Sequence, residues 1–458
     1  MKMSKVALGL VTALTGLAVA PTVLANPVEG FEYHGYFRAG ILLSAEDDFK
    51  RRSNFAGQKE TLGRLGIEAD NNFSASFANT WTWDEDKSFK AVLGLGTLDE
   101  EAGKDSTGGL GGTGIDNGFV EFRGMSSSGT VWGGGREYGK VDNYIFMTDF
   151  FYSDMSGIGT GIVNYEIGES LWDFAYIASD RSSSEFDRWN DDSAEIGNNT
   201  TNLNNLLHAL HIGVSYGDVR LSALVKGMVD NWDKEGNEWA ETGFDLTFTY
   251  TMHSFFGLPG NGDSRLIVQG GKGLGAGNLL AGTITGYNAY GPGSLAQGQH
   301  NDWGDAGDAN YLITHLEEDD LSGRVLLWGR YTFDNGLSLF PSIQGQYNYM
   351  AEGDVRTDSD YNYWVSAMVR PTMPISEYFY LQGELGYVYN NWGGSSWTQS
   401  KFTIAPTFIM ATPYGVAPEI RFLASYLPKS WTNEEEQADG STELGDDFIV
   451  GVQADVWW

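Results

Sequence analysis

The feature that most constrains the fold of this chain is a period of two in its apolar residues. In the closing stretch DDFIVGVQADVWW, every second residue from Phe448 to Trp458 is apolar, and the residues that alternate with them include Asp447, Gln453 and Asp455. The same alternation recurs in YFRAGILLS, GFDLTFTYT and EIRFLASY. Successive side chains of a β-strand point to opposite faces, so these stretches are predicted to be strands with one apolar face and one polar face.

The connections between such strands alternate in length. Eight short, turn-like junctions are predicted at residues 84–87, 126–129, 168–171, 217–218, 257–263, 334–336, 374–377 and 413–417. Nine longer polar segments alternate with them, near 45–60, 98–115, 136–160, 179–207, 228–240, 270–322, 350–362, 390–398 and 427–445. With both chain ends on the short-turn side, this pattern gives 18 strands. Alternating short turns and long loops with an even strand number are typical of outer-membrane barrels.

The start of the chain predicts export. Residues 1–25, MKMSKVALGLVTALTGLAVAPTVLA, have two early lysines, an apolar stretch and a small-residue cleavage site, which is the pattern of a secretory signal peptide. No later segment approaches the ~18 consecutive apolar residues of a membrane-spanning helix. If the mature protein spans a membrane, it must therefore do so as a closed barrel, because an open sheet edge would leave backbone groups unpaired. A secreted soluble β-protein is the less favoured alternative.

We therefore expect an all-β fold: one 18-stranded antiparallel transmembrane β-barrel over residues 26–458, with long extracellular loops and a wet lumen. The location is then the Gram-negative outer membrane, with its lipid as a partner. On the apolar face of the last strand, Trp458 belongs to the interfacial aromatic belt, and Trp457 points into the lumen.

Composition and charge exclude several classes of function. The chain has 61 acidic and 28 basic residues, a net charge of −33, which argues against a nucleic-acid partner. It contains no cysteine, so disulfides, thiolate chemistry and cysteine-ligated metals are excluded. The acidic stretch NDWGDAGD could supply calcium ligands, but its spacing matches no defined calcium loop, and a solvated loop is favoured. No metal or cofactor is expected.

Several stretches, taken in order, resemble the maltoporin family of sugar-specific outer-membrane porins. They are FEYHGYFRAGI, GRLGIE, DEDKSF, GTVWGGGREYGKVDNYIFMTDFFYSDMSGIGTG, VRP at 369–371, PEIRFLASY and the closing VWW. The resemblance extends from about Phe31 to Trp458. It implies an 18-stranded barrel, a homotrimer and passive diffusion of maltose and maltodextrins through each subunit, with no catalysis.

The physical basis of such transport can be stated independently. Sugar rings have apolar C–H faces, which stack weakly on aromatic side chains, and a rim of hydroxyls, which exchange hydrogen bonds with charged side chains. Weak binding at many successive positions lets a ligand both enter and leave a channel.

The resemblance assigns sugar-stacking positions. It matches Tyr36 and Trp457 to the family's aromatic track, and Trp457 also follows from the period of two. At two further positions of the track this chain departs from the family, with Asn72 and Gly415 where aromatic residues are expected. Their neighbours Phe73 and Tyr414 are the candidate replacements.

The resemblance also assigns hydroxyl-binding and constriction positions. These are Arg38, Arg64, Lys140, Asp142, Asp149, Phe151 and Asp116. Phe151 replaces a family tyrosine and Asp116 replaces an arginine, so the basic side of the constriction is weaker here. The segment EEAGKDSTGGLGGTGID, which would reach a neighbouring subunit, holds no aromatic residue.

These departures leave alternatives open. The channel could serve another oligosaccharide, or be a weakly selective diffusion pore. An outer-membrane enzyme and an adhesin are rivals from other classes. Asp142 and Asp149 could form the carboxylate pair of a glycosidase, but they lie in a loop with no matched acid–base environment in the sequence.

Overall fold

The computed structural model describes sixteen stretches of the chain, which are residues 30–51, 58–68, 71–84, 86–97, 113–125, 128–140, 143–148, 150–180, 206–228, 240–283, 316–354, 359–392, 395–410, 416–428, 431–432 and 446–458. The predicted signal peptide lies outside these residues. In the described stretches no helix has the length and apolar character needed to cross a membrane.

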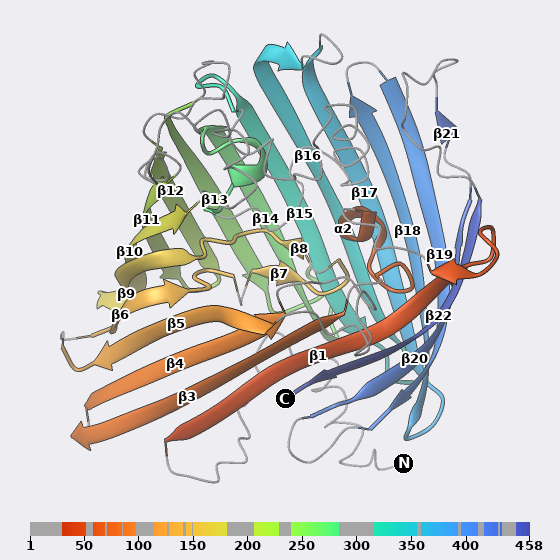
Figure 1. The fold of residues 1–458 in the computed structure, drawn as a ribbon, viewed down its shortest axis with the longest axis horizontal. Coiled ribbons are helices and arrows are strands. Elements are labelled where there is room, and N and C mark those ends of the chain that lie inside the picture. Colours follow the sequence, from red (N-terminus) through yellow and green to blue (C-terminus); the bar gives the residue numbers. More distant parts are fainter. Residues whose placement is uncertain are drawn as a thin grey trace, which may run out of the picture.

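Eighteen long antiparallel strands form one closed barrel (Figure 1). They are β1 (Phe31–Ser44), β3 (Asn72–Asp84), β4 (Lys87–Thr97), β5 (Thr113–Arg123), β6 (Thr130–Arg136), β9 (Gly157–Ile167), β10 (Ser170–Asp180), β11 (Leu206–Tyr216), β12 (Val219–Gly227), β13 (Thr242–Met252), β14 (Asn261–Gly273), β15 (Leu321–Thr332), β16 (Ser338–Asp354), β17 (Ser359–Pro374), β18 (Phe379–Trp392), β19 (Ser395–Ile409), β20 (Glu419–Leu427) and β22 (Asp447–Trp457). Each pairs with the next long strand, and β22 pairs with β1, so the ring has no free edge. The predicted fold is confirmed.

Six smaller elements accompany the barrel. They are β2 (Lys50–Arg51), α2 (Gln58–Leu62), β7 (Tyr144–Ile145), β8 (Phe150–Phe151), η3 (Gly277–Leu279) and β21 (Trp431–Thr432). The two-residue strands β2 and β21 extend the sheet, whereas β7 and β8 form a separate hairpin. In Figure 1, α2 and the β7–β8 hairpin lie within the ring of strands.

The period of two sets the two faces of the wall. On β22 the buried residues are Asp447, Ile449, Gln453 and Asp455, and between them Phe448 and Val452 are exposed. On β20 the same alternation buries Glu419 and Arg421 and exposes Phe422. The outer face is therefore apolar, and the inner face is polar and covered by other parts of the protein, as a barrel in lipid requires.

The strand junctions confirm the predicted order of short and long connections, with two differences in length. All eight predicted short junctions separate consecutive long strands. At 350–362 and 390–398, however, where long loops were predicted, β16 and β17 are separated only by residues 355–358, and β18 and β19 only by residues 393–394. Asn362, Asn390 and Asn391 continue the strand pairing here, and the Asn348 side chain donates a hydrogen bond to that of Asn362 at 2.6 Å between β16 and β17.

Candidate functional site

The two terminal tryptophans point to opposite sides of the wall. Trp457 pairs in register with Tyr36, and directly paired residues project to the same face. It packs on an inner cluster of Tyr380, Ile409 and Ala417. Trp458 lies over Gly35 on the other face, with its ring centroid 5.5 Å from that of Tyr33, which is itself 40% exposed. Tyr36, Trp457 and Tyr380 thus form an aromatic group on the inner wall, where β1, β22 and β18 contribute side chains.

Phe73 does not belong to this group, and its predicted stacking role is corrected. It pairs in register with Phe37, which points away from the lumen because its neighbours Tyr36 and Arg38 point inward. The residue of β3 beside Arg38 on the inner face is Asn72. Phe73 is one residue away from the expected position at Asn72, and neighbouring side chains of a strand point to opposite faces, so the Phe73 ring faces the lipid. The other replacement candidate, Tyr414, lies outside the described residues.

Segment 58–68, which contains α2, fills part of the lumen. Residues 59–68 are buried and carry several charges, which are Lys59, Glu60, Arg64 and Glu68. The Glu68 carboxylate forms ion pairs with Arg38 at 2.9 Å, Lys59 at 3.1 Å and Arg64 at 3.6 Å. Burial alone would raise the pKa of the Glu68 carboxyl, but these three cations together hold it well below its usual range.

The same segment is fastened to the opposite strands of the wall by a second set of buried charges. The Glu384 carboxylate pairs with Arg370 and Lys401, both at 2.5 Å, and accepts a hydrogen bond from the Leu65 backbone N–H at 2.9 Å. Asp455 pairs with Arg421 at 2.8 Å and with Arg64 at 3.4 Å.

Sequence reasoning named Arg38 and Arg64 here but missed Glu68, Glu384 and Arg370. The sequence held a partial signal for them, because a charged residue on the inward face of a strand needs an oppositely charged partner if it is buried. Arg38 and Arg64 lie in buried ion pairs, so contact with a sugar hydroxyl would require an exchange of partners, and that role remains a prediction.

A second inward segment, described at residues 137–140, 143–148 and 150–156, brings three of the predicted constriction residues together. The Lys140 ammonium pairs with Glu137 at 2.7 Å and lies 4.8 Å from the Phe151 ring centroid. Asp116 is within electrostatic reach of both Glu137 and Lys140. Asp154 is buried in the same segment and accepts hydrogen bonds from the backbone N–H and hydroxyl of Ser156. Burial raises the Asp154 pKa, and Lys140 opposes this. Asp142 and Asp149 lie outside the described residues.

A β-bulge aims Asp116 into the lumen. The register between β4 and β5 shifts after the pair Gly94–Asn117, so that Leu95 pairs with Ile115 and Asp116 is the extra residue. Ile115 is 70% exposed on the outside, whereas the Asp116 carboxylate occupies the space that a Cβ on Gly96 would take on the inside. Glycine at position 96 is therefore required for this placement.

The two inward segments touch one another. The Arg64 backbone N–H donates to the Met147 carbonyl at 2.8 Å. The guanidinium groups of Arg64 and Arg370 lie 5.6 Å and 5.0 Å from the Phe146 ring centroid. The lumen is thus narrowed by two segments that support each other, with aromatic and charged side chains at their borders. Among the residues that the structure describes, no three His, Asp or Glu side chains gather in a metal-binding arrangement.

Comparison with known proteins identifies the family. The LamB porin family model matches residues 31–458. The chain belongs to the LamB porin family. It is a Gram-negative outer-membrane β-barrel porin. It is similar to maltoporin 2 of Yersinia pestis, with 25% identity over 97% of this chain and 98% of the relative. It is also similar to the maltoporin of Vibrio cholerae, with 24% identity over 96% of this chain and 98% of the relative. Among solved structures, OccAB1 of Acinetobacter baumannii covers 94% of this chain and 97% of its own, with a TM-score of 0.48 and 12% identity.

Proposed function

We propose that this LamB-family porin conducts maltose and maltodextrins passively across the outer membrane, without catalysis, as a homotrimer. The observation that carries the proposal is the inner-wall pairing of Tyr36 with Trp457. Two aromatic side chains on adjacent strands and one face offer neighbouring stacking surfaces for the apolar faces of consecutive sugar rings. The maltoporin relatives support maltodextrin as the substrate class.

Charged groups of the second inward segment and of β5 would serve the sugar hydroxyls. Lys140 lies 4.8 Å from the Phe151 ring centroid and within electrostatic reach of Asp116, which brings a donor, an acceptor and an aromatic ring close to one another. We assign the hydroxyl-binding role to Lys140 and Asp116 in particular, because the Lys140 pair is partly exposed, at 26% and 36% of its side chains. Asp142 and Asp149 are proposed for the same role.

The test is current block by maltohexaose in planar bilayers. Block that depends on sugar concentration is expected for the wild type. Tyr36→Ala and Trp457→Ala should each raise the half-blocking concentration about tenfold, since an aromatic stacking contact contributes roughly 1–1.5 kcal/mol. Phe73→Ala is the matched control, because its ring is on the outer face, and it should leave the block unchanged. A wild-type current that no oligosaccharide reduces would refute the proposal in favour of a general pore.

A further inference from the structure

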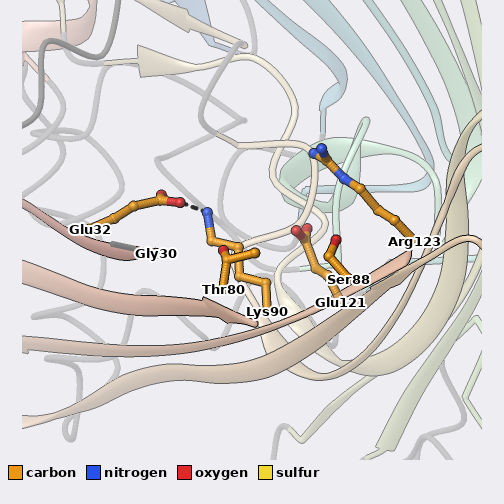
Figure 2. A pocket seen from close by; sticks show the side chains of 7 residues that line it. All are labelled: Gly30, Glu32, Thr80, Ser88, Lys90, Glu121 and Arg123. Atoms are coloured by element: carbon orange, nitrogen blue, oxygen red, sulfur yellow. Dashed lines mark hydrogen bonds and ion pairs between the residues drawn. The ribbon is translucent and has the colours of Figure 1, made fainter. Parts of the chain in front are cut away.

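A second polar site lies on the inner wall, at residues that belong to neither inward segment. It is a pocket of about 290 Å³. Figure 2 shows its lining residues, which are Gly30, Glu32, Thr80, Ser88, Lys90, Glu121 and Arg123. They come from the ends of β1, β3, β4 and β5 that adjoin the short turn at 84–87. Short turns of an outer-membrane barrel face the periplasm, so the pocket lies at the exit of the lumen.

The register places the pocket's side chains on the lumen face. Glu32 is four residues from Tyr36 on β1, so both side chains point the same way, about 13 Å apart along the strand. Across the sheet, Thr80 pairs with Lys90, and Lys90 pairs with Glu121. A ligand that leaves the level of Tyr36 and Trp457 toward the periplasm therefore passes this wall.

The ion pairs of the pocket differ from those that hold segment 58–68. Lys90 pairs with Glu32 at 2.6 Å, with the side chains 27% and 23% exposed. Arg136 pairs with Glu121 at 3.0 Å, with the side chains 22% and 16% exposed. The pairs around Glu68 and Glu384 are at most 6% exposed. The donors and acceptors of the pocket thus remain accessible to a ligand.

Arg123 adds a guanidinium that no carboxylate in the described part of the chain neutralises. It is exposed, and it pairs in register with Ser88, whose hydroxyl also lines the pocket. In Figure 2 its guanidinium extends beyond Glu121 and Ser88. The lining carries two carboxylates and two cations, and Arg136, which pairs with Glu121, adds a third cation beside them. Donors and acceptors that alternate on this wall suit the hydroxyl rim of a sugar.

We infer that this pocket is an exit subsite for oligosaccharides, in which Glu121, Arg123 and the Glu32–Lys90 pair bind the hydroxyls of the leading sugar unit. The inference rests on the proposed function and extends it to a part of the wall that has no stacking residue assigned. The guanidinium carbon of Arg136 lies 4.7 Å from the ring centroid of the nearby Phe119 and covers this ring. The inferred subsite therefore recognises sugar hydroxyls only and has no aromatic stacking surface.

The test uses the full-length protein in planar bilayers, with maltohexaose added to one side at a time. Glu121→Gln and Arg123→Met should each raise the half-blocking concentration about tenfold for sugar added from the short-turn side, since a hydrogen bond to a charged group is lost. Asp263→Asn is the matched control. Asp263 pairs with Arg330 at 2.5 Å on β14 and β15, at comparable exposures of 29% and 19%, on a different part of the wall.

Each outcome decides the inference. Weaker block in Glu121→Gln and Arg123→Met, with Asp263→Asn unchanged, supports the subsite. If maltohexaose blocks Glu121→Gln and Arg123→Met as it blocks the wild type, while Tyr36→Ala still weakens the block, the exit subsite is overturned and the proposed function stands. Absence of block in the wild type overturns both. The unblocked conductance of each variant is measured first, and Ser88→Ala replaces any variant that lowers it.

Discussion

At the scale of single residues, Glu68 has the largest consequence for the lumen. One carboxylate, 2% exposed, faces three cations from segment 58–68 and β1. Removing one partner of a buried ion pair typically costs about 3–5 kcal/mol, because the remaining charges stay buried without compensation. The docking of the segment therefore depends on Glu68.

A pH dependence follows from the depressed pKa of Glu68. Its folded-state pKa lies below the unfolded value of about 4.3, so its stabilisation is fully present above about pH 4.3 and is lost as the pH falls toward the folded value. Single-channel conductance should stay constant between pH 8 and pH 5 and rise at lower pH as the segment leaves the wall. Glu68→Gln should show the raised conductance already at pH 7. Asp47→Asn, in an exposed pair with Lys50, should behave as the wild type. A conductance step between pH 7 and pH 5 would contradict this assignment.

The period of two predicts the correct face of the wall for each side chain whose position in its strand was identified correctly. The pattern alone predicts that Trp457 points inward, and it packs on an inner cluster; Glu419 and Arg421, which alternate with the apolar residues of EIRFLASY, are buried on the same face of the wall. Phe73 was misplaced because a shift of one residue moves a side chain to the other face, and the sequence holds no local mark of the correct register at Asn72.

At the scale of elements, the strands could be predicted from the sequence, but the inward course of segment 58–68 could not. Its anchors lie far away in the chain, and the contact between Leu65 and Glu384 spans 319 residues. A polar stretch between two strands has the same composition whether it extends into solvent or folds into a polar lumen. Only the charges that it meets there distinguish the two.

A glycine on β18 allows this docking and can be used to prevent it. A Cβ on Gly386 would collide with the Leu62 backbone of α2, whereas the strand pairing of β18 uses only backbone groups. Gly386→Val should therefore displace segment 58–68 from the wall and raise single-channel conductance, while the barrel still folds. Gly383→Ala on the same strand is the control, since its Cβ would meet only ordinary contacts from 3.4 Å. Unchanged conductance in Gly386→Val would show that the segment does not narrow the pore.

At the scale of the whole molecule, closure of the ring accounts for the positions of Trp457 and Trp458. A terminal strand is usually frayed, but β22 pairs on both sides, with β20 and with β1. The last residue is held by two backbone hydrogen bonds to Gly35, at 2.9 Å and 3.0 Å. One indole can then face lipid and the other the lumen, which neither a soluble sheet nor an open edge would allow.

The closing register can be tested because the chain contains no cysteine. Ala39 pairs directly with Ala454, and directly opposite residues on antiparallel strands lie within the Cα separation that a disulfide requires. After oxidation in detergent, Ala39→Cys combined with Ala454→Cys should lose both free thiols. Ala39→Cys combined with Val452→Cys lies diagonally, about 7–8 Å apart, and should keep both. Equal oxidation of the two pairs would mean that β1 and β22 slide against each other, and no oxidation of either would mean that the chain ends do not meet. The first result alone fits a ring whose first and last strands are locked in the register that places Trp457 beside Tyr36.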